Sequence, residues 1–305
     1  MSKSNWREHL KDRRVIASVS GGKDSAALSL WLTEQGIDHD RVFMDTGWEH
    51  PDTYAYLRGP LTEKLGPIKE IKSAKYPGGM VELVTKKSMF PSRMRRFCTQ
   101  ELKVFPMQKH INAIVDAGAE VVNAVGIRRG ESVARSKMDE WEWSDGFDCE
   151  VWRPLVEWSE QDVIDIHHKH DLRPNPLYLQ GWSRVGCFPC IFARKDEIRL
   201  AALNLPSRID QIEEMERSIA AKTDERNAVR VAEGGGTSPA STFFQKSAQS
   251  LDNKMGMTPI RDAVSWANTG AGGKQFELFA AAESDAGCMR WGLCDTNPKD
   301  VEESK

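Results

Sequence analysis

The first half of the chain alternates short apolar segments with longer ones in which apolar residues recur at helical spacing. We expect strands at residues 15–19, 41–44, 67–71 and 120–127. The periodic segments predict a helix that ends near Gln35 and further helices at 53–65, 80–86 and 99–117, the last perturbed by Pro106. Largely apolar strands separated by helices predict a doubly wound, mostly parallel α/β sheet that is covered on both faces.

The second half of the chain is predicted to be a helical C-terminal region. Ser159 precedes two acidic residues, which is typical of an N-cap and predicts a helix over residues 159–170. Further amphipathic helices are expected at 196–203, 207–221 and 259–266. The glycine-rich segment 233–239 is expected to be a flexible joint. It divides a first domain, residues 1–232, from a C-terminal extension, residues 233–305.

Composition narrows the class of protein. With 305 residues, the chain is long enough for one large domain or two small ones. A formal net charge of −3 gives no general basic character, so any nucleic-acid contact must be local. No segment resembles a membrane span, and the N-terminal residues lack the apolar core of a secretion signal. We therefore expect a cytoplasmic protein without membrane contact, whose six cysteines are reduced, metal-bound or catalytic.

A glycine turn follows the first expected strand. Residues 20–25 read Ser-Gly-Gly-Lys-Asp-Ser, and a helical pattern begins directly after them. A strand, a glycine turn and a helix N-terminus together present backbone N–H groups to phosphate. Gly21 and Gly22 let the backbone approach an anion closely, and Lys23 adds a positive charge. The spacing differs from that of the Walker P-loop.

This turn resembles the PP-loop of the ATP pyrophosphatase superfamily, whose enzymes cleave ATP between its α- and β-phosphates. Further segments extend the resemblance to the phosphoadenylyl-sulfate (PAPS) reductase family over roughly residues 15–191. In family order, these segments are residues 45–54, 95–106, 126–135, 153–163 and 186–190. The resemblance implies an adenine nucleotide alpha hydrolase-like fold and membership of the iron–sulfur-binding branch.

The resemblance also implies a nucleotide site beyond the carboxyl ends of the strands. The expected nucleotide-binding residues are Ser20, Gly21, Gly22, Lys23, Asp24, Ser25, Asp45, Gly126 and Arg128. The expected catalytic residues are Lys23, Asp24, Asp45, Arg128 and Arg129. We expect Asp24 or Asp45 to hold Mg²⁺, and the two arginines to orient the α-phosphate or the acceptor. Backbone and apolar groups near Ala17 and residues 43–44 are expected to cover the adenine.

Cys187 and Cys190 form a Cys-x-x-Cys pair, whose spacing suits zinc, an iron–sulfur cluster or disulfide exchange. Thioredoxin-like exchange is disfavoured because the pair follows a proline-rich loop instead of opening a helix. Resemblance to the assimilatory adenylyl-sulfate reductases implies a 4Fe–4S cluster, although their Cys-Cys pair is represented here by a single cysteine. The expected ligands are Cys98, Cys187, Cys190 and a tail cysteine, either Cys294, which is preferred, or Cys288. Cys149 is expected to be a strand cysteine without a metal role.

Basic residues gather just before Cys98, at positions 86, 87, 93, 95 and 96. They are expected to form a positive rim at the site, suited to a polyanionic substrate or a nucleic-acid backbone. A solvated loop with no binding role is the alternative explanation for the same residues.

Three functions stay open. The first is an ATP-dependent enzyme that adenylates its substrate, releases pyrophosphate and uses the cluster in sulfur transfer. Its acceptor would be a nucleic acid or a protein, and a further protein would donate sulfur or electrons. The second is a reductase that releases sulfite from PAPS or adenylyl sulfate. The third is a non-catalytic, metal-bearing nucleic-acid-binding protein.

Lys23 and the tail favour the first function. Adenylyl sulfate has no β- or γ-phosphate, whereas a pyrophosphate leaving group needs positive charge as its bond breaks. In addition, the family's reductases carry their nucleophile in an acidic-Cys-Gly-aliphatic-His motif, and the residues around Cys294 do not form this motif. The segment at residues 45–54 is closer to the reductases and argues the other way. The sequence is also compatible with a homodimer of this chain.

Overall fold

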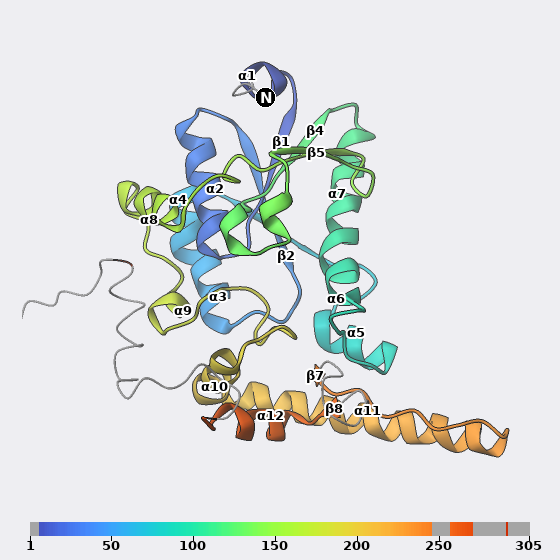
Figure 1. Cartoon of the computed structure of the whole chain (residues 1–305). Coiled ribbons are helices and arrows are strands. Elements are labelled where there is room, and N and C mark those ends of the chain that lie inside the picture. The colour runs from blue at the N-terminus through green and yellow to red at the C-terminus, as the bar shows by residue number, and fades with distance from the viewer. Residues whose placement is uncertain (1–5, 246–256, 271–290, 292–305) are drawn as a thin grey trace, which may run out of the picture.

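The computed structural model describes residues 6–245, 257–270 and 291. Its centre is a six-stranded sheet in the order β3-β2-β1-β4-β6-β5 (Figure 1). The strands are β1 (Arg14–Ser18), β2 (His39–Asp45), β3 (Ile68–Lys72), β4 (Val121–Ala124), β5 (Trp141–Ser144) and β6 (Cys149–Trp152). All neighbours pair in parallel except β5, which is antiparallel to β6. The mostly parallel, doubly wound sheet is therefore confirmed.

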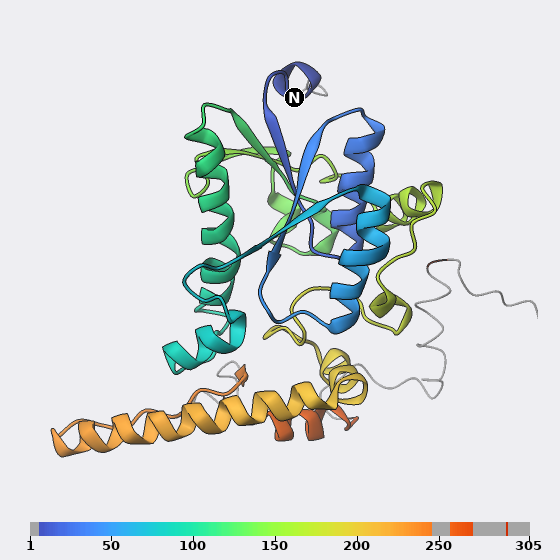
Figure 2. The same cartoon turned by 180° about the vertical axis from the view of Figure 1, so that it is seen from behind.

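Helices from the first part of the chain surround the sheet and cover both of its faces (Figures 1 and 2). They are α1 (Trp6–His9), α2 (Lys23–Glu34), α3 (Pro51–Tyr56), α4 (Thr62–Leu65), α5 (Gly79–Lys87), α6 (Phe97–Thr99) and α7 (Phe105–Val115). Val15 and Ala17 pack toward α2, whereas Ile16 between them packs toward α7. Successive side chains of a strand point to opposite faces, so a strand covered on both sides must be apolar at every position.

Prolines divide two of the predicted helices. The helix expected at 53–65 contains a π-helical turn, η1 (Leu57–Leu61), around Pro60. The helix expected at 99–117 is divided by a second π-helical turn, η2 (Gln100–Val104), and Pro106 lies in the first turn of α7. A proline is tolerated there because the first N–H groups of a helix have no partner within it. The perturbation expected at Pro106 is thus confirmed.

The chain after β6 is largely helical where it is described. Its elements are α8 (Glu160–Lys169), α9 (Pro176–Leu179), α10 (Lys195–Asn204), α11 (Pro206–Ala232), α12 (Ile260–Ala267) and the strand pair β7 (Phe244–Gln245) and β8 (Met257–Thr258). Short 3-10 turns, η3 (Arg129–Glu131) and η4 (Arg135–Lys137), follow β4. The Ser159 hydroxyl caps α8 by accepting a hydrogen bond from the Asp162 N–H at 3.1 Å, as predicted.

Helix α11 runs eleven residues past the end expected at position 221 and projects from the body of the molecule (Figures 1 and 2). The chain then returns along it. The buried carboxylate of Glu216 accepts hydrogen bonds from the N–H groups of Phe243 and Ile260, each at 2.9 Å. The domain boundary at 232/233 stays a prediction. No helix among the described residues is both long enough and apolar enough to span a bilayer.

Candidate active site

The phosphate loop, residues 20–25, connects the carboxyl end of β1 to α2. The Ser25 hydroxyl closes it by accepting a hydrogen bond from the Ser20 N–H at 3.0 Å and donating one to the Gly22 carbonyl at 2.9 Å. Gly21 has φ +75°, and a Cβ there would lie 2.9 Å from Cγ2 of Thr53. Both constraints require glycine. The strand, glycine turn and helix predicted from the sequence are present.

A distant segment holds this loop from outside. The Asn175 amide donates hydrogen bonds to the Gly21 carbonyl at 3.2 Å and to the Thr53 hydroxyl at 3.3 Å. The Tyr178 hydroxyl accepts a hydrogen bond from the Lys23 N–H at 3.2 Å. Burial raises the pKa of Tyr178, so this phenol stays neutral. The start of α9 therefore determines the position of the loop, and the Lys23 amide has a partner within the protein.

Positive charge gathers at the loop. The Lys23 ammonium lies 3.3 Å from a carboxylate oxygen of Glu160 and 4.8 Å from the centroid of the Tyr178 ring. The side chain of Lys23 is only 9% exposed, whereas that of Glu160 is 42% exposed. Arg128, from the segment after β4, forms a largely buried ion pair with Asp24. The topology thus brings Lys23, Asp24 and Arg128 together at the carboxyl edge of the sheet, as predicted.

Gly126 allows the close contact between the β4 segment and the loop. A Cβ at this position would lie 2.5 Å from the carbonyl oxygen of Asp24, which is far inside van der Waals contact. A Cβ at Gly130, four residues later, would meet nothing within 4 Å. Gly126 is therefore a site of backbone-to-backbone packing, and Gly130 is a matched position without that constraint.

We expect Gly126→Ala to destabilise the fold by about 1–3 kcal/mol, because backbone must move to admit the methyl group. Gly130→Ala should change stability by less than about 1 kcal/mol. Urea unfolding of both variants and the parent checks the difference. Equal midpoints for the two variants would contradict the assigned packing role.

A first cavity of about 220 Å³ opens at the carboxyl ends of β1, β2 and β4. Phe43 and Met44 line it, and so do Ser20 of the loop and Asn123 and Val125 of the β4 segment. We call it the nucleotide cavity. Its wall includes Phe43 and Met44, which were expected near the adenine, but not Ala17, which is fully buried in the core. The cavity continues to Ser20 of the phosphate loop.

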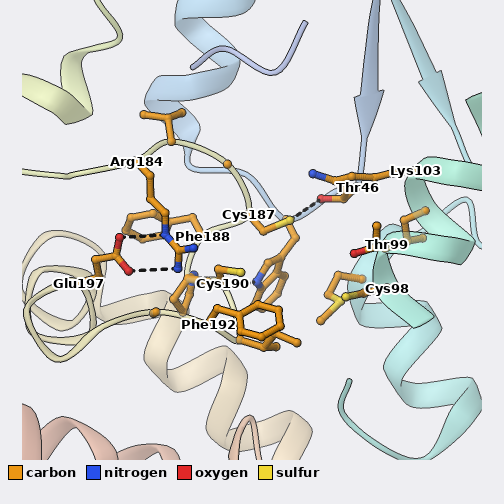
Figure 3. Close-up of a pocket in the computed structure, with 18 of the residues that line it drawn as sticks. Thr46, Cys98, Thr99, Lys103, Arg184, Cys187, Phe188, Cys190, Phe192 and Glu197 are labelled. Carbon is orange, nitrogen blue, oxygen red and sulfur yellow. Dashed lines mark hydrogen bonds and ion pairs between the residues drawn. The ribbon is translucent and has the colours of Figure 1, made fainter. Parts of the chain in front are cut away.

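A second cavity, also of about 220 Å³, contains the thiols of Cys98, Cys187 and Cys190 in its lining, and we call it the thiol cavity (Figure 3). Cys98 comes from α6, and the other two come from the loop after α9. Backbone contacts hold that loop to the end of β2: the Phe188 N–H donates to the Trp48 carbonyl at 2.7 Å. Three cysteines that lie far apart in the sequence therefore share one cavity.

Lys103 and Gly186 line both cavities, so the two adjoin. The pKa of Lys103 is raised, chiefly by the charge of an ionised Cys187 and despite partial burial. Burial raises the pKa of Cys187 to about 11, and the charge of Lys103 opposes that rise. Burial also raises the pKa of Cys98. Thiols in this state are protonated at neutral pH and lose their protons on binding a metal.

The sequence model of the phosphoadenosine phosphosulfate reductase domain matches residues 14–193. That is more than half of the chain. The chain belongs to this family. The matched residues contain the phosphate loop, the nucleotide cavity and all three described thiols of the second cavity.

Several known proteins are similar to this chain. An uncharacterized protein of Escherichia phage 186 is 32% identical over 92% of this chain and 96% of its own length. The adenosine 5'-phosphosulfate reductase of Allochromatium vinosum is 32% identical over 58% of this chain and 67% of its own. An uncharacterized protein of Methanocaldococcus jannaschii is 27% identical, and only 42% of its length is covered. The crystal structure of PAPS reductase from Candida auris aligns over 60% of this chain and 86% of its own, with 18% identity and a TM-score of 0.48.

In this PAPS reductase domain, Asp45 is buried and already has partners. Its carboxylate accepts hydrogen bonds from the Tyr54 hydroxyl at 2.6 Å and the Gly47 N–H at 2.8 Å, and it pairs with Lys72 at 3.2 Å. Burial alone would raise the pKa of Asp45, but these interactions together lower it. The carboxylate is therefore ionised, with both of its oxygens engaged.

Arg129 is placed differently from Arg128. Its guanidinium donates to the Met138 carbonyl at 3.0 and 3.2 Å and pairs with Glu157. These contacts hold the 3-10 turns after β4 in place. Of the two adjacent arginines, Arg128 meets the phosphate loop directly.

Three thiols share a cavity, yet the described part of the chain contains no group of three or more His, Cys, Asp or Glu close enough to hold a metal ion. Cys288 and Cys294 lie outside the described residues. Cys149 is buried on β6, as predicted, and packs with Ile16 and residues of α7. Thiols are the donors that iron–sulfur clusters use, but the described residues by themselves do not form a ligand set for a metal.

Sequence reasoning missed Asn175, Tyr178 and Glu49. Asn175 lies between two prolines, a pattern typical of a helix stop, and no pattern connects Tyr178 to the loop. The buried Glu49 carboxylate accepts hydrogen bonds from the Thr46 and Tyr54 hydroxyls and lines the nucleotide cavity. Its place within the matched 45–54 segment was the one available signal.

Proposed function

We propose that this chain is an ATP-dependent enzyme that cleaves ATP between the α- and β-phosphates and adenylates its substrate. The observation that carries the proposal is the Lys23 ammonium, which is nearly buried beside a glycine turn at a helix N-terminus. A cation at this place suits the β- and γ-phosphates of ATP, which adenylyl sulfate lacks. Family membership supports sulfur metabolism as the setting.

In the proposed reaction, the nucleophilic atom of the acceptor bonds to the α-phosphorus as the bond to the bridging oxygen breaks. Pyrophosphate leaves with the bonding electrons, so negative charge grows on the leaving group. Lys23 and the N–H groups of the loop would stabilise that charge, and Arg128 would orient the α-phosphate. Arg129 would act through the turn that it holds.

The proposed reaction would use Mg²⁺, and the protein would need to supply only one or two of its ligands. Magnesium commonly binds one or two carboxylates together with substrate phosphates and waters. Asp24 lies on the loop, and Asp45 is the last residue of β2, at the same edge of the sheet. Each carboxylate has a cationic partner, Arg128 or Lys72, that must yield part of its contact to the metal.

We further propose that Cys98, Cys187 and Cys190 hold a 4Fe–4S cluster with Cys294 or Cys288. When bound, the cluster would supply the sulfur-transfer chemistry. The buried indole N–H of Trp182, in the cavity wall, has no hydrogen-bond partner among the described residues and suits an acceptor such as sulfide. The charge of Lys103 favours the thiolate form of Cys187.

The position of Trp291 supports a tail ligand. Trp291 is 3% exposed and packs with Ile164 and Tyr178, next to Val185. Val185 itself lines the thiol cavity, two residues before Cys187. Both tail cysteines are three residues from Trp291, a span of at most about 11 Å of extended chain.

Sulfonucleotide reduction is the second candidate. It is favoured by the relative from Allochromatium vinosum, a protein named as an adenosine 5'-phosphosulfate reductase. In that reaction a cysteine thiolate would attack the sulfur of the sulfonucleotide and release an adenosine phosphate. A reductant would then free sulfite from the enzyme-bound sulfur.

One experiment separates the two candidates. Anaerobically purified protein is incubated with Mg²⁺ and ATP, adenylyl sulfate or PAPS in separate reactions, each with a dithiol reductant. We expect pyrophosphate from ATP, with water in place of the acceptor, and no sulfite from the other two nucleotides. Sulfite release without pyrophosphate release would overturn the proposal in favour of reduction.

A further inference from the structure

The mouth of the thiol cavity carries positive charge without compensation. Residues 92–96 form a tight turn before α6, in which the N–H and carbonyl groups of Ser92 and Arg95 bond to each other at 3.1 and 3.2 Å. Arg93, Arg95 and Arg96 are exposed, and none of them pairs with a carboxylate in the described ranges. Arg96 also lines the cavity.

An aromatic ring lies beneath two of these arginines. The guanidinium carbons of Arg96 and Arg93 are 5.1 and 5.8 Å from the centroid of the Phe192 ring. Phe192 follows Cys190 by two residues and lines the same cavity as the three thiols (Figure 3). Next to them, Met94 is 93% exposed, which is unusual for a large apolar side chain. We call Arg93, Met94, Arg95, Arg96 and Phe192 the arginine mouth.

We propose that the arginine mouth binds single-stranded nucleic acid and presents one base to the thiol cavity. This inference rests on the proposed function and deepens it by naming the acceptor. Unpaired guanidinium groups suit phosphates, and guanidinium planes and aromatic rings are the surfaces on which unpaired bases stack. An acidic protein would pair with the arginine charges, but it would make no specific contact with the Phe192 ring.

The shape of the site favours a single strand over a duplex. The thiols line a partly open cavity behind the mouth, and Trp48, Trp182 and Phe188 form part of its wall. A base in a duplex must leave its stack to reach such a space, whereas an unpaired base is free to enter. Aromatic walls of this kind suit the flat faces of a nucleobase.

Binding is tested on the full chain, purified anaerobically and without ATP. Fluorescence anisotropy is recorded with labelled 12-nucleotide RNA and DNA single strands, their duplexes and a polyglutamate peptide of equal length. We expect a single strand to bind most tightly, with an affinity that falls as salt rises. Tighter binding of polyglutamate or of a duplex, or no binding of either strand, would overturn the proposal.

Substitutions locate the surface. Arg93→Ala/Arg96→Ala should weaken single-strand binding about tenfold or more and lower the log–log salt slope by about 1.4, because two phosphate contacts are lost. Phe192→Leu keeps the apolar character and should weaken binding about fivefold through lost stacking. The matched control is Lys11→Ala/Lys64→Ala, which removes two exposed charges just before β1 and β3, at the opposite edge of the sheet.

An equal loss of binding in the control, or an unchanged affinity in both mouth variants, would contradict the assignment. The outcome is separable from that of the proposed function. Binding without pyrophosphate release from ATP would contradict the adenylation chemistry alone, and pyrophosphate release without binding would contradict the acceptor alone.

Discussion

Lys23→Ala should lower the rate of pyrophosphate release from ATP by about 10²–10³-fold, the typical cost of removing one preorganised charge-stabilising group. The ammonium is held beside the phosphate loop by the Tyr178 ring and Glu160, so it needs little rearrangement when a triphosphate binds. The effect should fall mainly on kcat, because the charge on the leaving group grows only as the bond breaks. A coupled pyrophosphate assay over a range of ATP concentrations measures both parameters.

The fold should survive this substitution. The alanine variant loses one partly exposed ion pair and one cation–π contact, together worth about 1–2 kcal/mol, so the melting temperature should fall by only a few degrees. Lys64→Ala, at an exposed position in α4, is the matched control and should keep full activity. Unchanged ATP turnover in Lys23→Ala would remove the basis for an ATP pyrophosphatase.

Cys187→Ala/Cys190→Ala should abolish the broad absorbance near ~410 nm and the bound iron that we expect of the anaerobically purified chain. Both thiols line one cavity, and loss of two of four ligands leaves too few thiolates for a cluster. Iron and sulfide content per chain, with the absorption spectrum, measure the result.

Cys149→Ala is the matched control for the cysteine variant, since it removes a buried thiol that belongs to the sheet and not to the cavity. It should keep its iron, although a small cavity in the core should cost about 1 kcal/mol. A colourless parent protein with one zinc ion per chain would contradict the cluster. Equal iron loss in both variants would show that the effect is one of folding.

Much of the site was predictable because its signals are local. The phosphate loop combines glycines, a lysine and a helix start within six residues, and each element is recognisable from its neighbours in the chain. The proximity of the loop to Arg128 also follows, because parallel strands bring their carboxyl ends to one edge, although the ion pair with Asp24 itself was not predicted. The β5–β6 hairpin was not predicted, because the edge strand β5 is short and half-exposed and carries no continuous apolar pattern.

Other features depend on contacts across more than a hundred residues. Nothing near Asn175 or Tyr178 in the sequence indicates that they hold the Gly21 carbonyl and the Lys23 amide. Likewise, Asp45 was named as a possible Mg²⁺ ligand, but no pattern in the sequence indicates that Tyr54 and Lys72 contact its carboxylate. Hydrogen-bond partners are set by how elements pack, and a sequence pattern records only which side of an element is apolar.

The sequence by itself determined the alternating α/β architecture, the phosphate loop and the candidate chemistry of lysine, arginine and cysteine, because periodicity and short motifs act over a few neighbouring residues. Only the tertiary structure decided that Lys103 separates two adjoining cavities, that three distant cysteines share one of them, and that Arg93 and Arg96 stack over Phe192 at its mouth. These residues come together only when the sheet, helices and loops pack against one another. The free energy that holds them in place comes from the packing of the whole domain and not from neighbouring residues in the chain.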